Sequence, residues 1–103
     1  MADVTIPGGT ADLANAARNL AVIYSGKNAR ILLDLHDQLT DDVIRLIKMQ
    51  LKAEEPAYAT AASAIQDASE YIGDGMKKID DIAKGIDLLK KVADAVVKLV
   101  TLA

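Results

Sequence analysis

Apolar side chains recur at intervals of three and four residues along most of the chain. This spacing places them along one side of an α-helix. The sequence has no pair of alternating apolar runs joined by an Asn-Gly or Asp-Gly turn, which is the pattern of a β-hairpin. The pattern therefore predicts an all-α protein.

The first predicted helix covers about residues 11–25 and follows a leader over residues 1–9. Thr10 can accept a backbone hydrogen bond as the N-cap of this helix, and Gly26 can end it in a left-handed conformation. We therefore expect a flexible leader followed by a single helical domain over residues 10–103.

The second predicted helix covers about residues 28–54, with Asn28 as its N-cap and Pro56 opening the next helix. Residues 40–42 could restart a helix, but the apolar spacing continues through them, so we expect one helix. Further apolar positions beside the main stripe, at Leu33, Ile44, Ile47 and Leu51, indicate more than one neighbouring helix. The main stripe consists of Leu32, His36, Leu39, Val43, Leu46, Gln50 and Ala53.

The second half of the chain keeps one apolar register from Ala61 to Val100, alternating intervals of three and four residues. This is a heptad pattern, typical of helices that pack along one seam. On the opposite side of this helix, acidic residues precede basic residues by four positions. Such pairs stabilise a helix and are typical of a solvent-exposed face. These pairs are Asp80 with Lys84, Asp87 with Lys91, and Asp94 with Lys98. The side chains expected to carry core packing are Leu39, Val43, Leu46, Ile79, Ile82, Ile86 and Leu89.

Gly73 and Gly75 form a candidate hinge, because two glycines inside a helix cost about 2 kcal/mol relative to alanine although the apolar register continues through them. Two structures stay open. A continuous last helix of roughly 70 Å would give three long helices and would need a partner to cover it. A break would give an antiparallel four-helix bundle, with helices over about residues 11–25, 28–54, 56–72 and 76–102.

Two similar triplets occur in the chain, Tyr24-Ser25-Gly26 and Tyr71-Ile72-Gly73. Each follows an Ala-rich segment and precedes an apolar helix, which is compatible with an internal duplication. Ala-rich helices also resemble one another without common ancestry, so the triplets do not establish a repeat.

The composition limits the classes of partner. Apolar residues make up 51% of the chain, but Phe and Trp are absent, so the core is expected to consist of Ala, Ile, Leu and Val. A net charge of −3 gives no basic excess for nucleic acid or an anionic membrane. The absence of Cys excludes disulfides and thiolate chemistry. No signal peptide or membrane-spanning stretch is evident, so we expect a cytoplasmic protein, with signal-independent secretion as the alternative.

His36 is the only histidine and lies on the apolar stripe beside Asp37. A zinc site needs three or four ligands, and the chain offers neither a second His nor a Cys. We therefore expect His36 to be packed or to face a partner, and we interpret His36 and Gln50 as polar positions that fix helix register or oligomeric state. The scattered acids have no specific spacing, and no phosphate loop or nucleophile motif is present. We expect no catalytic, cofactor or metal site, and no enzyme activity.

The C-terminal segment is mostly apolar, with more apolar positions than one seam requires. Val96, Leu99 and Val100 are the candidate partner interface. The sequence thus predicts a helical interaction or assembly protein, such as a subunit, adaptor or small inhibitor, which binds itself or another protein through apolar helix faces. The alternative is a membrane-active protein that inserts its apolar C-terminal helix.

Overall fold

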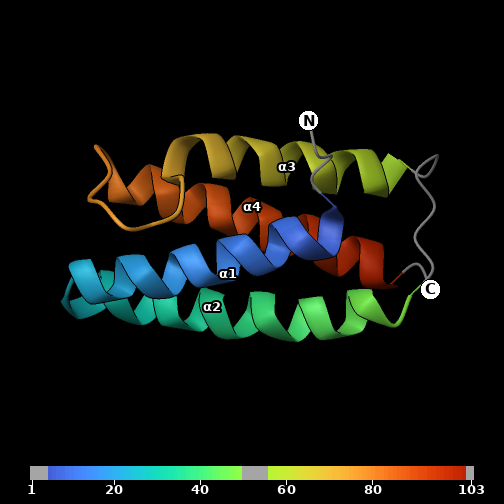
Figure 1. Cartoon of the computed structure of the whole chain (residues 1–103), viewed down its shortest axis with the longest axis horizontal. Coiled ribbons are helices and arrows are strands. Elements are labelled where there is room, and N and C mark those ends of the chain that lie inside the picture. Colours follow the sequence, from blue (N-terminus) through green and yellow to red (C-terminus); the bar gives the residue numbers. More distant parts are fainter. Residues whose placement is uncertain (1–4, 50–55, 102–103) are drawn as a thin grey trace.

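The computed structural model describes residues 5–49 and 56–101, and these residues form four α-helices with no strand among them (Figure 1). The helices are α1 (Ile6–Ile23), α2 (Gly26–Ile47), α3 (Pro56–Ile72) and α4 (Ile82–Thr101). The predicted all-α class is confirmed, in its four-helix form.

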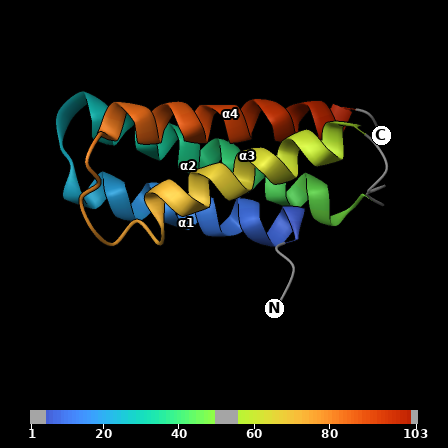
Figure 2. The ribbon, with the colours of Figure 1, turned by 90° about the horizontal axis from the view of Figure 1, so that it is seen from above.

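The bundle consists of two antiparallel hairpins, α1 with α2 and α3 with α4. The hairpins pack so that α1 lies against α3 and α2 lies against α4, and each of these pairs runs in the same direction (Figures 1 and 2). The other two combinations lie on the diagonals of the bundle, so each helix has two main neighbours. The two hairpins share one core between them.

The core is aliphatic, as the composition predicts. Alanines on α1 and α3, among them Ala17 and Ala61, are fully buried, and such small side chains allow neighbouring helices to approach closely. Of the predicted core residues, Leu39, Leu46, Ile86 and Leu89 are buried, whereas Val43, Ile79 and Ile82 are half-buried. The largest fully buried side chains are Ile6, Leu13, Leu20, Leu32, Leu39, Leu46, Ile65, Leu89, Val92 and Val96.

The prediction for the start of the first helix is wrong. Helix α1 begins at Ile6, and its N-cap is Thr5, whose hydroxyl oxygen accepts a hydrogen bond from the Gly8 N–H at 3.0 Å. Thr10, the predicted cap, lies inside the helix, where its buried hydroxyl donates to the Ile6 carbonyl oxygen at 2.7 Å. Pro7 is tolerated in the first turn because its missing N–H would have no helical partner there. The predicted leader therefore extends too far, while residues 1–4 lie outside the described residues.

The turn between α1 and α2 also differs from the prediction. Ser25, not Asn28, occupies the N-cap of α2. Gly26 has the predicted left-handed conformation, with φ +67°, but it opens α2 instead of ending α1. Helix α2 continues through residues 40–42 as predicted and ends at Ile47. The predicted register residue Gln50 lies outside the described residues.

The candidate hinge is a true break between helices. Helix α3 starts at Pro56 as predicted and ends at Ile72, and both Gly73 and Gly75 have positive φ, +64° and +74°. The alternative of one continuous helix is therefore wrong. Helix α4 starts at Ile82, later than the predicted residue 76, because Asp81 acts as a cap whose Oδ1 accepts from the Lys84 N–H at 3.2 Å.

The loop between α3 and α4 is held against the ends of α1 and α3 by two tyrosines. The Tyr24 hydroxyl donates to the Ile79 carbonyl oxygen at 3.1 Å and accepts from the Ile79 N–H at 3.2 Å. The Tyr71 hydroxyl makes the same pair of bonds with Asp81, at 3.3 and 3.0 Å. The two similar triplets thus supply tyrosines with the same role. These bonds satisfy loop backbone groups that have no helical partner.

Candidate functional site

The predicted partner interface on the last helix is not an exposed surface. Val96 and Leu99 are buried in the core, with 0% and 3% of their surface exposed, and Val100 is half-buried. This corrects the prediction. The physical reason is that α4 packs against both α2 and α3, so its wide apolar side is covered within the bundle. None of the helices in the described part of the chain has the length and apolar character needed to cross a bilayer.

His36 joins α2 to α1. Its Nδ1 lies 2.7 Å from the carbonyl oxygen of Ala14, and the side chain is half-buried. Because a carbonyl oxygen can only accept, Nδ1 carries the proton in this hydrogen bond. The contact supports the interpretation of His36 as a packed polar residue, while its role in helix register stays a prediction. Within residues 5–49 and 56–101, no group of three or more His, Cys, Asp or Glu residues could hold a metal ion.

Asp42 lies inside the bundle, whereas its neighbour Asp41 is exposed. Only 3% of its surface is exposed, and its Oδ2 atom has no hydrogen-bond partner. Burial raises the pKa of the Asp42 carboxyl above its ordinary value, and the neighbouring Asp41 adds to this shift while Arg45 opposes it. A buried carboxylate with an unpartnered oxygen atom is costly, so we expect Asp42 to lower the stability of the bundle when it is charged.

The side of α2 that faces away from the bundle carries large aliphatic residues. Leu33, Ile44 and Ile47 expose 46%, 51% and 68% of their surface. Intervals of eleven and three residues place them on one stripe of a helix, together with the exposed Thr40. We call these four residues the outer face of α2. The sequence pattern predicted that the aliphatic ones contact a further helix, but no further helix among residues 5–49 and 56–101 covers them. Leu51, which the prediction grouped with them, lies outside the described residues.

Charged residues follow one flank of the outer face of α2 in a fixed order. Asp34, Asp37 and Asp41 come first along the helix, and Arg45 and Lys48 follow at its C-terminal end. Helical geometry puts all five on the same side of the apolar stripe, and all are exposed. The flank is therefore negative in its first part and positive in its second. Lys52, the next basic residue in the sequence, lies outside the described residues.

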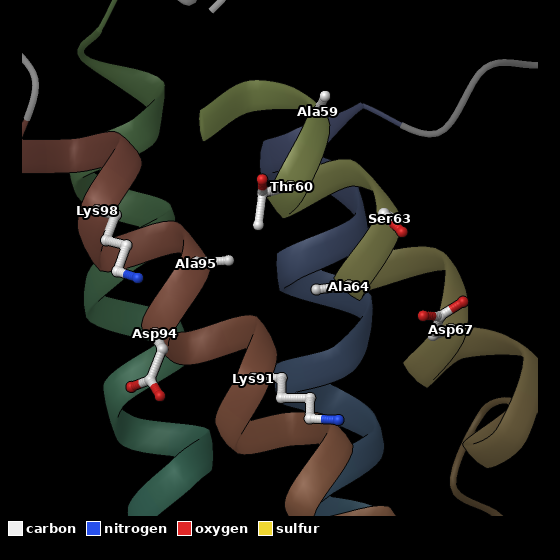
Figure 3. A pocket seen from close by; sticks show the side chains of 9 residues that line it. All are labelled: Ala59, Thr60, Ser63, Ala64, Asp67, Lys91, Asp94, Ala95 and Lys98. Carbon is white, nitrogen blue, oxygen red and sulfur yellow. The ribbon is translucent and has the colours of Figure 1, made fainter. Parts of the chain in front are cut away.

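A second candidate is a groove between α3 and α4, with a volume of about 540 Å³ (Figure 3). Ala64 on α3 and Ala95 on α4 point toward one another across it, and two lysines and two aspartates surround this small-residue floor. The charges balance, and none of the lining residues is a His or Cys. The groove can accept a small apolar side chain, but its lining selects no particular ligand. The residues that line it are Ala59, Thr60, Ser63, Ala64, Asp67, Lys91, Asp94, Ala95 and Lys98.

A smaller hollow of about 390 Å³ lies beside Tyr71 and shares Asp67 with the groove. There the Lys84 ammonium lies 4.7 Å from the centre of the Tyr71 ring, within the range of a cation–π contact. Asp67 and Glu70 also line this hollow, so its lining has more acidic than basic side chains.

No family model, no curated protein and no solved structure matches this chain. The functional assignment therefore depends on the geometry of the chain itself. The outer face of α2 is its most distinctive surface, because it combines exposed aliphatic side chains with an ordered charged flank.

Proposed function

We propose that this chain is a non-enzymatic interaction or assembly protein that acts through the outer face of α2. The observation that supports it is the exposure of Leu33, Ile44 and Ile47 on one stripe. Complete burial of such a side chain stabilises by roughly 1.5 to 3 kcal/mol, so covering three half-exposed ones contributes about 3 kcal/mol. That gain is available only to a partner that covers the stripe as a whole.

Other exposed apolar residues support this choice by contrast. Val22 on α1, Met76 in the loop and Val97 on α4 are also exposed, but each stands on a different element. Single exposed apolar residues are common on monomeric proteins, whereas a contiguous stripe marks an interaction site. We leave enzyme activity out of the proposal on sequence grounds, since the chain has a single histidine and neither a nucleophile motif nor a phosphate loop.

The membrane-active alternative is less well supported. It requires α4 to insert its apolar side into lipid, yet Val92, Val96 and Leu99 lie in the shared core. Inserting them would first require opening the bundle and exposing the apolar sides of α2 and α3. We therefore do not propose a membrane function.

The proposal is tested by site-specific photo-crosslinking in the cells that naturally make this chain. Benzoyl-phenylalanine in place of Ile44 is expected to give discrete protein adducts on irradiation. The matched control replaces Ser63, an exposed residue on α3, and is expected to give none. Adducts of equal yield from both positions, or none from Ile44, would contradict a role for the outer face of α2.

A further inference from the structure

We infer that the partner of the outer face of α2 is a second copy of this chain, paired antiparallel across a two-fold axis beside Thr40. This inference rests on the proposed function and names its partner. A two-fold interface brings the same surface of both copies together, so that surface must be complementary to itself when reversed. The outer face of α2 meets this condition in two independent respects.

The apolar residues are complementary under reversal. Leu33 and Ile47 lie at equal distances along the helix on either side of Thr40. In an antiparallel pair centred on Thr40, Leu33 of each copy faces Ile47 of the other, so the two exposed side chains cover one another. Ile44 then lies opposite the half-buried His36. Each copy covers aliphatic surface that its own bundle leaves exposed.

The charges are complementary under nearly the same reversal. A two-fold axis perpendicular to two antiparallel helices brings the same flank of each helix together. Asp34 then faces Lys48 of the second copy, and Asp37 faces Arg45, with a centre only one residue from Thr40. Symmetry makes four opposite-charge pairs from these two relations, and it places the exposed Asp41 of each copy near its own counterpart, which is a single like-charge contact at the centre. In a parallel two-fold pair the charged flanks of the two helices would lie on opposite sides of the interface, so none of these opposite-charge pairs would form. The order of charges thus selects the antiparallel arrangement.

A cysteine at the proposed axis tests the geometry directly, because the chain has no cysteine of its own. Thr40 is exposed, so Thr40→Cys brings two thiols together in the antiparallel pair without disturbing the core. The variant is expected to form a reducible dimer at least about tenfold faster than Ser63→Cys on α3, since pairing raises the effective thiol concentration. Equal rates for the two variants would overturn the two-fold arrangement.

Charge reversal tests the orientation by analytical ultracentrifugation of the purified chain. Asp34→Lys with Asp37→Arg makes the flank cationic, and Arg45→Asp with Lys48→Asp makes it acidic. Each double variant is expected to weaken self-association about tenfold or more, because all four pairs become like-charged. The quadruple variant restores every opposite-charge pair at unchanged net charge, so it is expected to associate within a few-fold of the native chain.

A matched control separates the pairing from net charge. Asp67→Lys with Glu70→Lys on α3 changes the net charge as much as the cationic double variant, and it is expected to leave self-association unchanged. A quadruple variant that associates no better than the double variants would overturn the inference. A purified chain that stays monomeric, while Ile44 crosslinks to a different protein in cells, would overturn the second copy as partner and leave the proposed function standing. A monomeric purified chain together with no crosslinking from Ile44 in cells would contradict both the second copy as partner and the proposed function.

Discussion

Gly75 is a glycine whose backbone conformation and close neighbours leave no room for a side chain. It is buried and has a φ of +74°, which L-residues with a side chain rarely adopt. A Cβ atom at this position would lie within 3.0 Å of the O, Cα and C atoms of Ala16 on α1. These are backbone atoms of a packed helix, so they cannot move away by a change of rotamer as the end of a side chain could. Gly75→Ala therefore has to displace the loop from α1.

Gly73 provides the matched control. Its φ of +64° is equally unfavourable for alanine, but no atom lies within 4 Å of the position that a Cβ would take. Gly73→Ala is expected to lower the free energy of unfolding by about 1 to 2 kcal/mol, the cost of a left-handed alanine. Gly75→Ala carries the same cost and an overlap of roughly 1 to 3 kcal/mol, as in overpacked cores. A total of about 2 to 5 kcal/mol is a large part of the stability of a small domain.

Urea denaturation followed by far-ultraviolet circular dichroism measures both variants. The midpoints give the difference in free energy of unfolding, provided the slope with urea is unchanged. Gly75→Ala is expected to be the less stable of the two by at least about 1 kcal/mol. Equal stabilities would refute the close contact between the loop and α1. A gain in stability from both alanines would instead indicate one continuous helix through this region.

Three further substitutions test other parts of the structure. Asp42→Asn is expected to raise the free energy of unfolding at pH 7 by about 1 kcal/mol or more, because it removes an unpartnered buried charge. Folding raises the pKa of Asp42, so the native chain is expected to lose this disadvantage in the free energy of unfolding as the pH falls toward the ordinary pKa of 3.8. Urea titrations at several pH values measure the difference in stability between the variant and the native chain, and a difference that does not change with pH would contradict the reasoning. Tyr24→Phe is expected to cost about 1 to 3 kcal/mol and the more exposed Tyr71→Phe less, because each leaves two loop backbone groups without a partner; equal costs would contradict this order. Thr5→Ala is expected to cost about 1 kcal/mol in the same assay through loss of the α1 cap, and no effect would place the start of α1 elsewhere.

The position of a possible joint between α3 and α4 could be predicted from sequence, but the choice between a break and a continuous helix could not, nor could the start of α4. Two glycines inside a heptad pattern weaken a helix whatever surrounds them, so Gly73 and Gly75 marked the joint. Ile79 and Ile82 continue the apolar register, and nothing local distinguishes a loop from a helix there. The loop conformation depends on Tyr24, which lies 55 residues from its partner Ile79 in sequence. A contact of that kind cannot be read from a local pattern.

The buried side of α2 shows a different limit of sequence reasoning. Leu32, Leu39 and Leu46 belong to the predicted stripe and are buried, but the positions between them differ. The pattern favoured His36 and Val43, whereas the bundle buries Leu35 and Asp42. Burying a carboxylate in place of valine is locally unfavourable, so no propensity rule would select it. The choice follows from packing against two neighbours at once.

The sequence indicated the candidate site only through apolar positions on α2 beyond those that one packing seam needs. Leu33, Ile44 and Ile47 made the apolar side of α2 wider than one seam requires, and the sequence pattern therefore predicted a further neighbour for them. The pattern assigned that neighbour to the same chain. Only the packing of the hairpins shows that α1 and α4 occupy the other side of α2 and leave these three residues exposed.

The most direct test of the central claim is sedimentation equilibrium of the native chain and of a variant in which Leu33, Ile44 and Ile47 are all replaced by serine. The native chain is expected to shift with concentration from the 10.9 kDa of one copy toward twice that mass. The variant is expected to keep its helical content and to stay monomeric, because its substitutions lie outside the core. A variant that associates as strongly as the native chain would contradict the outer face of α2 as the interaction surface.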